Sequence, residues 1–213
     1  LPNNLLIDLS ADFRITSASV YKKFYHISHK SKSNIKKSIY FLPEINNKNV
    51  NKYKIISCPG CYPTSILIPL VPLLKRKLIH KNNIVIDSKS GYSGAGRGVH
   101  QKYKNHNLYE SLSSYGVGFH RHNSEITQEF SKISKKVIYN FTPHLTPMFR
   151  GILSSIYLDL PDGISAKKIL SFLKNEYKNR EFIKFEKLNK PLSTNSVINS
   201  NNCLLSICET KYK

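Results

Sequence analysis

A strand–turn–helix junction around Cys61 constrains this chain more than any other stretch. Residues 53–57 (YKIIS) favour a β-strand, and residues 66–74 (ILIPLVPLL) predict a buried helix that contains prolines. Between them, a Pro-Gly turn places Cys61 where the first N–H groups of the helix lack partners. The helix dipole favours a thiolate there and lowers the pKa of the thiol, which makes it reactive. The junction therefore predicts an activated nucleophile.

Three other interpretations of the same motif remain open at this point. Cys58 and Cys61 have the C-x-x-C spacing of a thioredoxin-like redox pair at the start of a helix. The two residues could equally form half of a zinc site that Cys203 and Cys208 complete. A free cysteine is also often a small buried hydrophobic residue with no chemical role.

Composition indicates a globular protein and argues against two classes of partner. The 33 Lys and Arg against 13 Asp and Glu give a net charge of +20, which would suit a nucleic-acid partner. However, the lysines are scattered and no basic stretch has regularly interleaved aromatic residues, so we predict no nucleic-acid binding. The apolar runs are too short for a membrane span of about 20 residues. Four cysteines in a chain of 213 residues indicate a reducing compartment, with the cytoplasm as the default.

Hydrophobic patterning predicts a mixture of strands and helices. Residues 5–9 are expected to form a short buried strand, and residues 15–38 a mostly irregular excursion. Further strands are predicted at residues 83–88, 137–141, 152–160 and 203–208, and helices at residues 123–130 and 166–178. Because strands and helices do not alternate strictly, we predict an α+β fold with a mixed or antiparallel sheet.

Polar residues beyond two predicted strands suggest a ligand crevice. Ser10 and Arg14 follow the first strand, where an open α/β sheet binds its ligands. Residues 89–98 (KSGYSGAGRG) follow another strand, and their small side chains allow a ligand to approach the backbone closely. The spacing of these glycines is not that of a dinucleotide-binding fingerprint.

A His-Arg-His cluster offers the proton-transfer partner that a cysteine nucleophile needs. His120 and His122 flank Arg121 just before the helix predicted at residues 123–130, which Asn123 or Ser124 would cap. A Cys/His pair generates a thiolate and a proton donor. A metal site would need a third ligand, for which Cys61 is the only strong candidate, so we predict no metal.

Six motifs, read in order along the chain, resemble one family. They are LIDLSADFR (6–14), LPE (42–44), PGCYPT (59–64), SGYSGAGR (90–97), HRH with Glu125 (120–125), and PHLTPM with Arg150 (143–150). They resemble the N-acetyl-gamma-glutamyl-phosphate reductases, the arginine-biosynthesis members of the semialdehyde dehydrogenase superfamily. The resemblance covers nearly the whole chain.

The resemblance implies an acyl-phosphate reductase. Cys61 would attack the acyl phosphate of N-acetyl-L-glutamyl phosphate, phosphate would leave, and NADPH would reduce the resulting thioester to N-acetyl-L-glutamate semialdehyde. His122, with His120 as the second candidate, would be the acid–base group, and Glu125 could orient its imidazole.

The resemblance also implies where the small molecules bind. The arginines that would hold the substrate carboxylate or phosphate are Arg14, Arg121 and Arg150. The residues that would lie against the nicotinamide end of NADP(H) are Ser90, Gly91, Ser93, Gly94 and Ala95.

Two parts are expected on the same grounds. Residues 1–60 would be the remnant of a Rossmann-like NADP-binding domain whose glycine-rich loop lies outside the chain. Residues 61–213 would be the catalytic and dimerisation domain, truncated before its closing helix. The resemblance implies a homo-oligomer, either dimer or tetramer. The nearest alternative is the aspartate-semialdehyde dehydrogenase family, which shares the mechanism but lacks the PGCYPT and HRH motifs.

Three positions depart from the family pattern. Cys58 stands where the family has Asn, Phe41 where it has Gly, and Ser124 where it has Pro. The departure at Cys58 makes the C-x-x-C spacing look accidental, yet it places a second thiol beside the expected nucleophile.

Overall fold

A small parallel sheet forms the N-terminal part of the protein. The computed structural model describes residues 4–46, 49–95 and 110–210. Strands β1 (Leu6–Asp8), β3 (Ile55–Ser57) and β2 (Ser38–Tyr40) lie in the order β1-β3-β2, and both pairings are parallel. The carboxyl ends of all three strands therefore meet at one edge, which is where α/β sheets bind ligands.

A mixed sheet of four strands forms the larger part. Strand β4 (Ile84–Gly91) pairs in parallel with β6 (Tyr139–Thr146) and antiparallel with β7 (Ile152–Tyr157). The short strand β5 (Ser113–Ser114) adds to the far side of β6. This mixed sheet beside a parallel remnant confirms the predicted α+β fold class.

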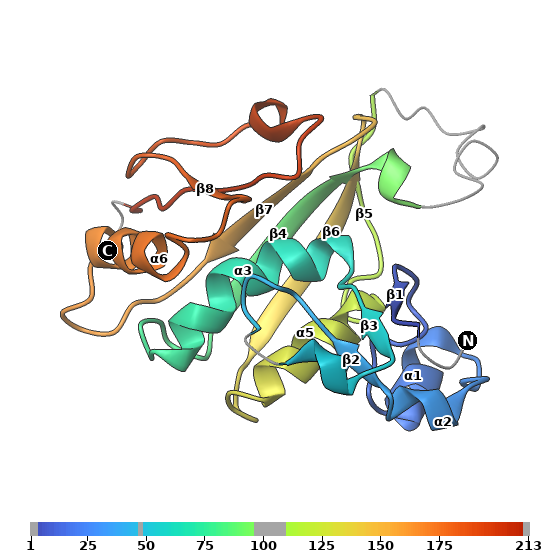
Figure 1. Ribbon diagram of the computed structural model, residues 1–213. Helices are drawn as coiled ribbons and strands as arrows, with labels where there is room; N and C mark the ends of the chain where they lie inside the picture. Colours follow the sequence, from blue (N-terminus) through green and yellow to red (C-terminus); the bar gives the residue numbers. More distant parts are fainter. Residues whose placement is uncertain (1–3, 47–48, 96–109, 211–213) are drawn as a thin grey trace.

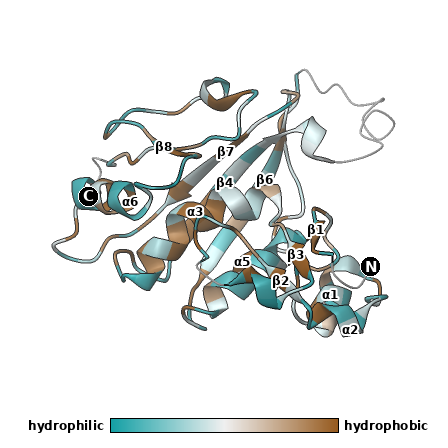
Figure 2. Cartoon of the chain, in the orientation of Figure 1, coloured by the Kyte–Doolittle hydropathy of each residue, from teal (hydrophilic) through white to brown (hydrophobic). Residues whose placement is uncertain are grey.

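Helix α3 (Cys61–Lys75) connects the two sheets and forms the centre of the core (Figure 1). Ten of its residues are buried, because it packs against β7 and against helices α5 (His122–Ser131) and α6 (Ala166–Glu176). Figure 2 shows the helix as hydrophobic along most of its length.

A proline inside α3 leaves one backbone carbonyl without its helical hydrogen bond, and a tyrosine distant in sequence supplies the donor. Pro72 has no N–H to donate to the Ile68 carbonyl four residues earlier. The Tyr177 hydroxyl donates to that carbonyl instead, at 2.5 Å. A side chain from another element thus replaces the backbone hydrogen bond that Pro72 cannot make.

The remaining elements surround these sheets. Helices α1 (Ala18–Tyr25) and α2 (Lys32–Ile35) lie between β1 and β2 in the chain, and the turn η1 (Val50–Lys52) lies between β2 and β3. The turn η2 (Tyr92–Ala95) follows β4 directly. The C-terminal elements are β8 (Ile183–Phe185), η3 (Thr194–Val197) and β9 (Cys203–Leu205), of which β8 and β9 pair in parallel.

Strand β1 was predicted to be buried, and this was wrong. Leu6 is 53% exposed and Ile7 is 61% exposed. Edge position alone does not decide this, since β2 lies at the opposite edge and is buried; β2 also packs against α2, whereas the contacts of β1 are chiefly with β3.

Two further local predictions were wrong. Residues 15–38 are not mostly irregular, because Ser17 caps α1 by accepting a hydrogen bond from the Val20 N–H. Neither Asn123 nor Ser124 caps α5, because the helix begins earlier, at His122. The predicted helix at residues 166–178 is confirmed as α6, and Ser165 caps it as expected.

Candidate active site

The turn that carries Cys61 is held on its β-sheet side by backbone and side-chain contacts. Strand β3 ends at Ser57, Gly60 precedes the helix, and Cys61 is the first residue of α3. The Cys58 N–H donates to the Asp8 carbonyl at 2.8 Å, and the Arg14 Nε donates to the Cys58 carbonyl at 2.8 Å. The predicted strand–turn–helix junction is therefore present, with the thiol at the helix N-terminus.

A fully buried carboxylate holds the same turn from the other side. Glu125 Oε2 accepts hydrogen bonds from the Gly60 N–H at 2.8 Å and from the Tyr40 hydroxyl at 3.0 Å. Its Oε1 lies 3.4 Å from Arg14 Nη1. Burial raises the pKa of Glu125, while Arg14 and the Gly60 N–H act in the opposite direction.

His122 packs directly against the turn and is 6% exposed. Its Nε2 lies 3.7 Å from Glu125 Oε1, which is an electrostatic contact rather than a hydrogen bond. Its Nδ1 is buried and has no hydrogen-bond partner among the described residues. Glu125 was expected to orient this imidazole, but its closest contacts are to the turn itself.

His120 lies beside His122 but is less enclosed. The His122 N–H donates to His120 Nδ1 at 3.2 Å, and the two rings meet edge to face with centroids 4.8 Å apart. The ring of Tyr62, the second residue of α3, packs edge-on against both imidazoles. The structure therefore brings Cys61, His120, His122 and Glu125 to one place.

Both imidazoles are neutral in the resting site. Burial lowers the pKa of His122 to about 2, and the positive charge of Arg14, with that of His120 when it is protonated, acts in the same direction. Burial followed by the charge of Arg121 lowers the pKa of His120 to about 4. A neutral imidazole at neutral pH can accept a proton, as a general base must.

The pKa of the Cys61 thiol is shifted in the direction opposite to the predicted one. The sequence predicts a lowered pKa, but partial enclosure by its neighbours raises the pKa of Cys61, although its side chain remains exposed. The backbone N–H groups of Tyr62 and Cys61 act in the other direction, as does Arg14. Desolvation outweighs the helix N-terminus, so deprotonation of the thiol requires a nearby base.

The lowered pKa values of the two histidines predict that the stability of the protein depends on pH. The folded pKa values of His120 and His122, about 4 and about 2, lie below the ordinary value of 6.5. Below pH 6.5 the unfolded chain therefore binds protons that the folded protein does not. We expect the free energy of unfolding to fall by about 1 kcal/mol per histidine between pH 7 and pH 5.5. Urea unfolding at the two pH values measures this.

The control for this prediction is a variant with both histidines replaced by glutamine. Its free energy of unfolding should fall less between the two pH values, by the contribution of the two imidazoles. An equal fall in both proteins would contradict the prediction.

The three predicted substrate-binding arginines have different environments. Arg14 is engaged with the protein, because its Nε, Nη1 and Nη2 contact the Cys58 carbonyl, Glu125 and the Leu9 carbonyl. Its other two N–H groups have no partner shown among the described residues, and they are suited to a ligand. Arg121 is exposed at the start of α5. The structure thus gives Arg14 a supporting role that the sequence did not predict.

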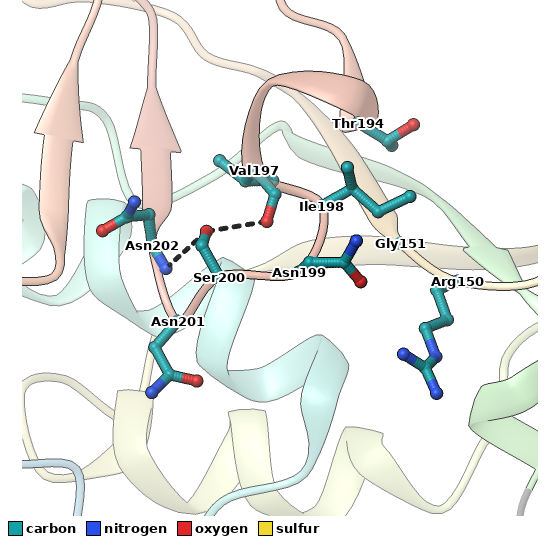
Figure 3. A pocket seen from close by; sticks show the side chains of 9 residues that line it. All are labelled: Arg150, Gly151, Thr194, Val197, Ile198, Asn199, Ser200, Asn201 and Asn202. Atoms are coloured by element: carbon teal, nitrogen blue, oxygen red, sulfur yellow. Dashed lines mark hydrogen bonds between the residues drawn. The ribbon is translucent and has the colours of Figure 1, made fainter.

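Arg150 lines a pocket of about 480 Å³ between the β6–β7 connection and the C-terminal segment. Three asparagine side chains, those of Asn199, Asn201 and Asn202, line the same pocket (Figure 3). The Arg150 guanidinium lies over the ring of Phe149, 5.2 Å from its centroid. A cation beside amide groups is suited to binding an anion.

The predicted cofactor residues lie at the end of β4 and in η2. Ser90 is 5% exposed, and its hydroxyl donates to the Gly91 carbonyl. A Cβ at Gly91 would lie 2.6 Å from the Phe149 carbonyl oxygen, so the lack of a side chain at Gly91 allows its backbone to pack closely against the backbone of Phe149. Ser93 and Gly94 follow in η2, where Ala95 is the last residue. The rest of this motif, residues 96–98, lies outside the described residues.

Two enclosed polar atoms mark the carboxyl ends of the parallel strands. Asp8 Oδ2, on β1, and Ser57 Oγ, on β3, have no hydrogen-bond partner among the described residues. Neither these two residues nor Tyr40 stood out in the sequence as site residues. Their types carry no signal by themselves, since only the pairing of distant strands brings them to the site.

The cysteines give no support to a disulfide or a metal site. All four are free thiols, including Cys58 and Cys61. Within residues 4–46, 49–95 and 110–210, no group of three or more His, Cys, Asp or Glu side chains is placed to hold a metal ion. Cys203 and Cys208 therefore do not complete a zinc site with the C-x-x-C pair.

In the described part of the chain, no helix is both long enough and apolar enough to span a bilayer.

Comparison with known proteins identifies relatives over most of the chain. The family model described as "Semialdehyde dehydrogenase, dimerisation domain" matches residues 61–213. A probable chloroplastic N-acetyl-gamma-glutamyl-phosphate reductase of Arabidopsis thaliana is 43% identical over 209 residues, which are 97% of this chain and 52% of the relative. An N-acetyl-gamma-glutamyl-phosphate reductase of Ehrlichia canis is 43% identical over 95% of this chain and 58% of the relative. The chain thus spans about half the length of these curated relatives.

Solved structures share the fold at low sequence identity. Aspartate semialdehyde dehydrogenase II from Vibrio cholerae superposes with a TM-score of 0.63 over 83% of this chain and 59% of its own, at 15% identity. A probable aspartate-semialdehyde dehydrogenase from Pseudomonas aeruginosa gives a TM-score of 0.57 over 79% of this chain and 57% of its own, at 13% identity.

Proposed function

Because the chain belongs to the semialdehyde dehydrogenase family, whose dimerisation domain it contains, we propose that it forms the catalytic part of an acyl-phosphate reductase. One observation carries the proposal: the exposed Cys61 thiol begins helix α3, and a buried neutral imidazole, His122, packs against the glycine just before it. A thiol and a base that two helices bring to the same turn are the groups that thioester chemistry requires first.

In the proposed mechanism, His122 accepts the thiol proton of Cys61 as the sulfur attacks the acyl carbon. The C–O bond to phosphate breaks, phosphate leaves with the electron pair of that bond, and an acyl-Cys61 thioester remains. The raised pKa of the Cys61 thiol requires such a base, and the lowered pKa of His122 keeps the imidazole free to act. His120 is the second candidate for this role.

The oxyanion that forms at the acyl carbon needs hydrogen-bond donors. The N–H groups of Cys61 and Tyr62 lie in the first turn of α3, next to the sulfur, and both act to lower the pKa of the thiol. They are fixed before the reaction begins, which makes such donors effective. After reduction, His122 returns its proton to the Cys61 sulfur as the aldehyde departs.

The substrate is proposed to be N-acetyl-L-glutamyl phosphate, an intermediate of arginine biosynthesis. This follows from the names of relatives that are 43% identical to the chain. Arg121 and Arg150 are exposed cations suited to the carboxylate or the phosphate, and the free N–H groups of Arg14 could assist. The rival substrate, an aspartyl phosphate, is suggested only by solved structures at 13–15% identity, which establish the fold alone.

The cofactor is proposed to be NADP(H), which supplies hydride to the thioester carbon when it is bound. Asp8 Oδ2 and Ser57 Oγ fit this proposal, because both lack a partner among the described residues at the carboxyl edge of the parallel sheet. Such groups suit the carboxamide or a ribose hydroxyl. Ser90, Gly91, Ser93, Gly94 and Ala95 are proposed to line the nicotinamide end.

A homo-oligomer is proposed as well. On one face of the mixed sheet, two cross-strand partners are exposed in the described part of the chain: Val85 is 41% exposed and Tyr157 is 54% exposed. A family whose domain is named for dimerisation is expected to use such a face for subunit contact. The cytoplasmic location stays a prediction, since the Arabidopsis relative is described as chloroplastic.

The reverse reaction in the full-length protein tests the proposed function. NADP reduction is followed with phosphate and N-acetyl-L-glutamate semialdehyde, and then with aspartate semialdehyde in its place. We expect kcat/KM to be at least about 100-fold higher for the N-acetylated aldehyde. A higher kcat/KM with aspartate semialdehyde would favour the aspartate-semialdehyde reaction, equal values would contradict the proposed substrate preference, and no phosphate-dependent turnover with either aldehyde would contradict both reactions.

A further inference from the structure

One oxygen atom, Glu125 Oε2, joins two groups that lie far apart in sequence. It accepts one hydrogen bond from the hydroxyl of Tyr40, at the end of β2, and another from the N–H of Gly60, in the turn before α3. Tyr40 is 4% exposed and Glu125 is 0% exposed. Side chains so enclosed act on the site through the protein groups they hold.

We propose that Tyr40 is a positioning residue for the cysteine chemistry. Its hydroxyl fixes the Glu125 carboxylate, which holds the Gly60 peptide and thereby sets Cys61 against His122. The proposal rests on the proposed function only for the reaction that is slowed, because the positioning itself concerns the thiol and its base.

The two oxygens of Glu125 divide two tasks. Oε2 receives both short hydrogen bonds, from Gly60 and Tyr40, so it fixes the turn. Oε1 faces Arg14 Nη1 at 3.4 Å and His122 Nε2 at 3.7 Å, so it faces the base that becomes positive when the thiol loses its proton. If the Tyr40 hydroxyl is removed, one oxygen keeps a single donor and the carboxylate is free to rotate away from both tasks.

The tolerance for such a displacement is small. A Cβ at Gly60 would lie 2.5 Å from His122 Nε2 and 3.0 Å from Arg14 Nη1, so imidazole and turn are already in close contact. A shift of about 1 Å in a reacting group can reduce a rate by about a hundredfold. A small rotation of the Glu125 carboxylate therefore has a measurable effect on Cys61.

The charge of Glu125 depends on the same hydrogen bond. The groups that face this carboxylate or act on its partners come from several elements: Arg14, Tyr25, Tyr40, Cys61, Arg121, His122 and Glu129. Burial raises the pKa of the Tyr40 hydroxyl, so it stays a donor throughout the neutral pH range. Because the Tyr40 hydrogen bond lowers the pKa of Glu125, its loss moves protonation of Glu125 to higher pH.

Tyr40→Phe in the full-length protein tests the proposal, with Tyr177→Phe as the matched control. Tyr177 is also a buried tyrosine whose hydroxyl makes one hydrogen bond, but it bonds the Ile68 carbonyl in the core. The first measurement is the rate of iodoacetamide alkylation at Cys61 as a function of pH, followed by mass spectrometry of the peptide. The second is kcat and KM for the proposed reaction.

Protonation of Glu125 should add a further fall at low pH to the titration of the Cys61 thiol, and for Tyr40→Phe we expect this additional fall to begin about one pH unit higher in both profiles. We expect kcat to fall about tenfold with KM within about twofold, because Tyr40 touches no ligand. Tyr177→Phe should lose stability but keep the wild-type pH profile. Glu125→Gln should remove this additional fall at low pH and leave only the titration of the Cys61 thiol, whereas Glu129→Gln, on the same helix and 5% exposed in the wild type, should keep it.

A folded Tyr40→Phe protein with the wild-type profile would overturn the proposal. An equal shift in Tyr177→Phe would also overturn it, because the effect would then reflect general destabilisation. Alkylation needs no substrate, so a shifted profile supports positioning by Tyr40 even in a protein that fails to reduce the acyl phosphate.

Discussion

Replacement of Cys61 by serine is expected to reduce turnover at least about a thousandfold. A serine hydroxyl has a much higher pKa than a thiol, so the same imidazole deprotonates it far less readily, and it is also a poorer nucleophile and leaving group in thioester-type chemistry. The assay is NADP reduction with N-acetyl-L-glutamate semialdehyde and phosphate. Circular dichroism establishes that the variant is folded.

Cys58→Ser is the matched control for this prediction. Cys58 lies in the same turn, but the turn is held through its backbone N–H and carbonyl, which serine retains. We expect this variant to keep most of the activity. If both substitutions abolish turnover equally, the redox-pair interpretation returns, since it requires two thiols.

Gly60→Ala is expected to damage the site more than any other single added methyl group. The new Cβ would lie 2.5 Å from Nε2 and 2.8 Å from Cδ2 of His122, so the imidazole or the turn must shift. We expect kcat to fall about a hundredfold. Overpacking of this kind also costs about 1–3 kcal/mol in the free energy of unfolding. Steady-state kinetics and urea unfolding measure the two effects.

Gly163→Ala is the control for the added methyl group. Gly163 has φ +75°, and a Cβ added there would meet nothing within 4 Å, so the change strains the backbone without touching the site. It should cost about 1 kcal/mol in stability and leave kcat unchanged. Wild-type kcat in Gly60→Ala would show that the turn can move without consequence and would contradict the mechanism.

Local patterns in the sequence predicted the centre of the site well. The PGC motif between a strand and an apolar helix predicted the position of Cys61, which the structure places at the first residue of α3. The six ordered motifs predicted the family, and this prediction is confirmed. Such features can be predicted from the sequence because each depends only on residues that are close together in the chain.

The contacts that hold the site could not be predicted from the sequence. Tyr40 and Glu125 are 85 residues apart, and their hydrogen bond depends on how β2 packs against α5. The direction of the Cys61 pKa shift was also missed, because a helix terminus is visible in sequence whereas desolvation by distant neighbours is not. Arg14 has the residue type of a substrate ligand, but three protein groups engage it.

The hydrogen bond from Tyr177 to the Ile68 carbonyl has a consequence for the order of folding. Pro72 leaves that carbonyl without an internal partner, and the replacement donor lies 109 residues further along the chain. Helix α3 therefore cannot complete its own hydrogen bonding early, while the chain explores only local structure. We expect the end of α3 to become stable only when α6 docks against it. The helix that begins at Cys61 would therefore be completed late in folding, when the C-terminal part of the chain makes its long-range contacts.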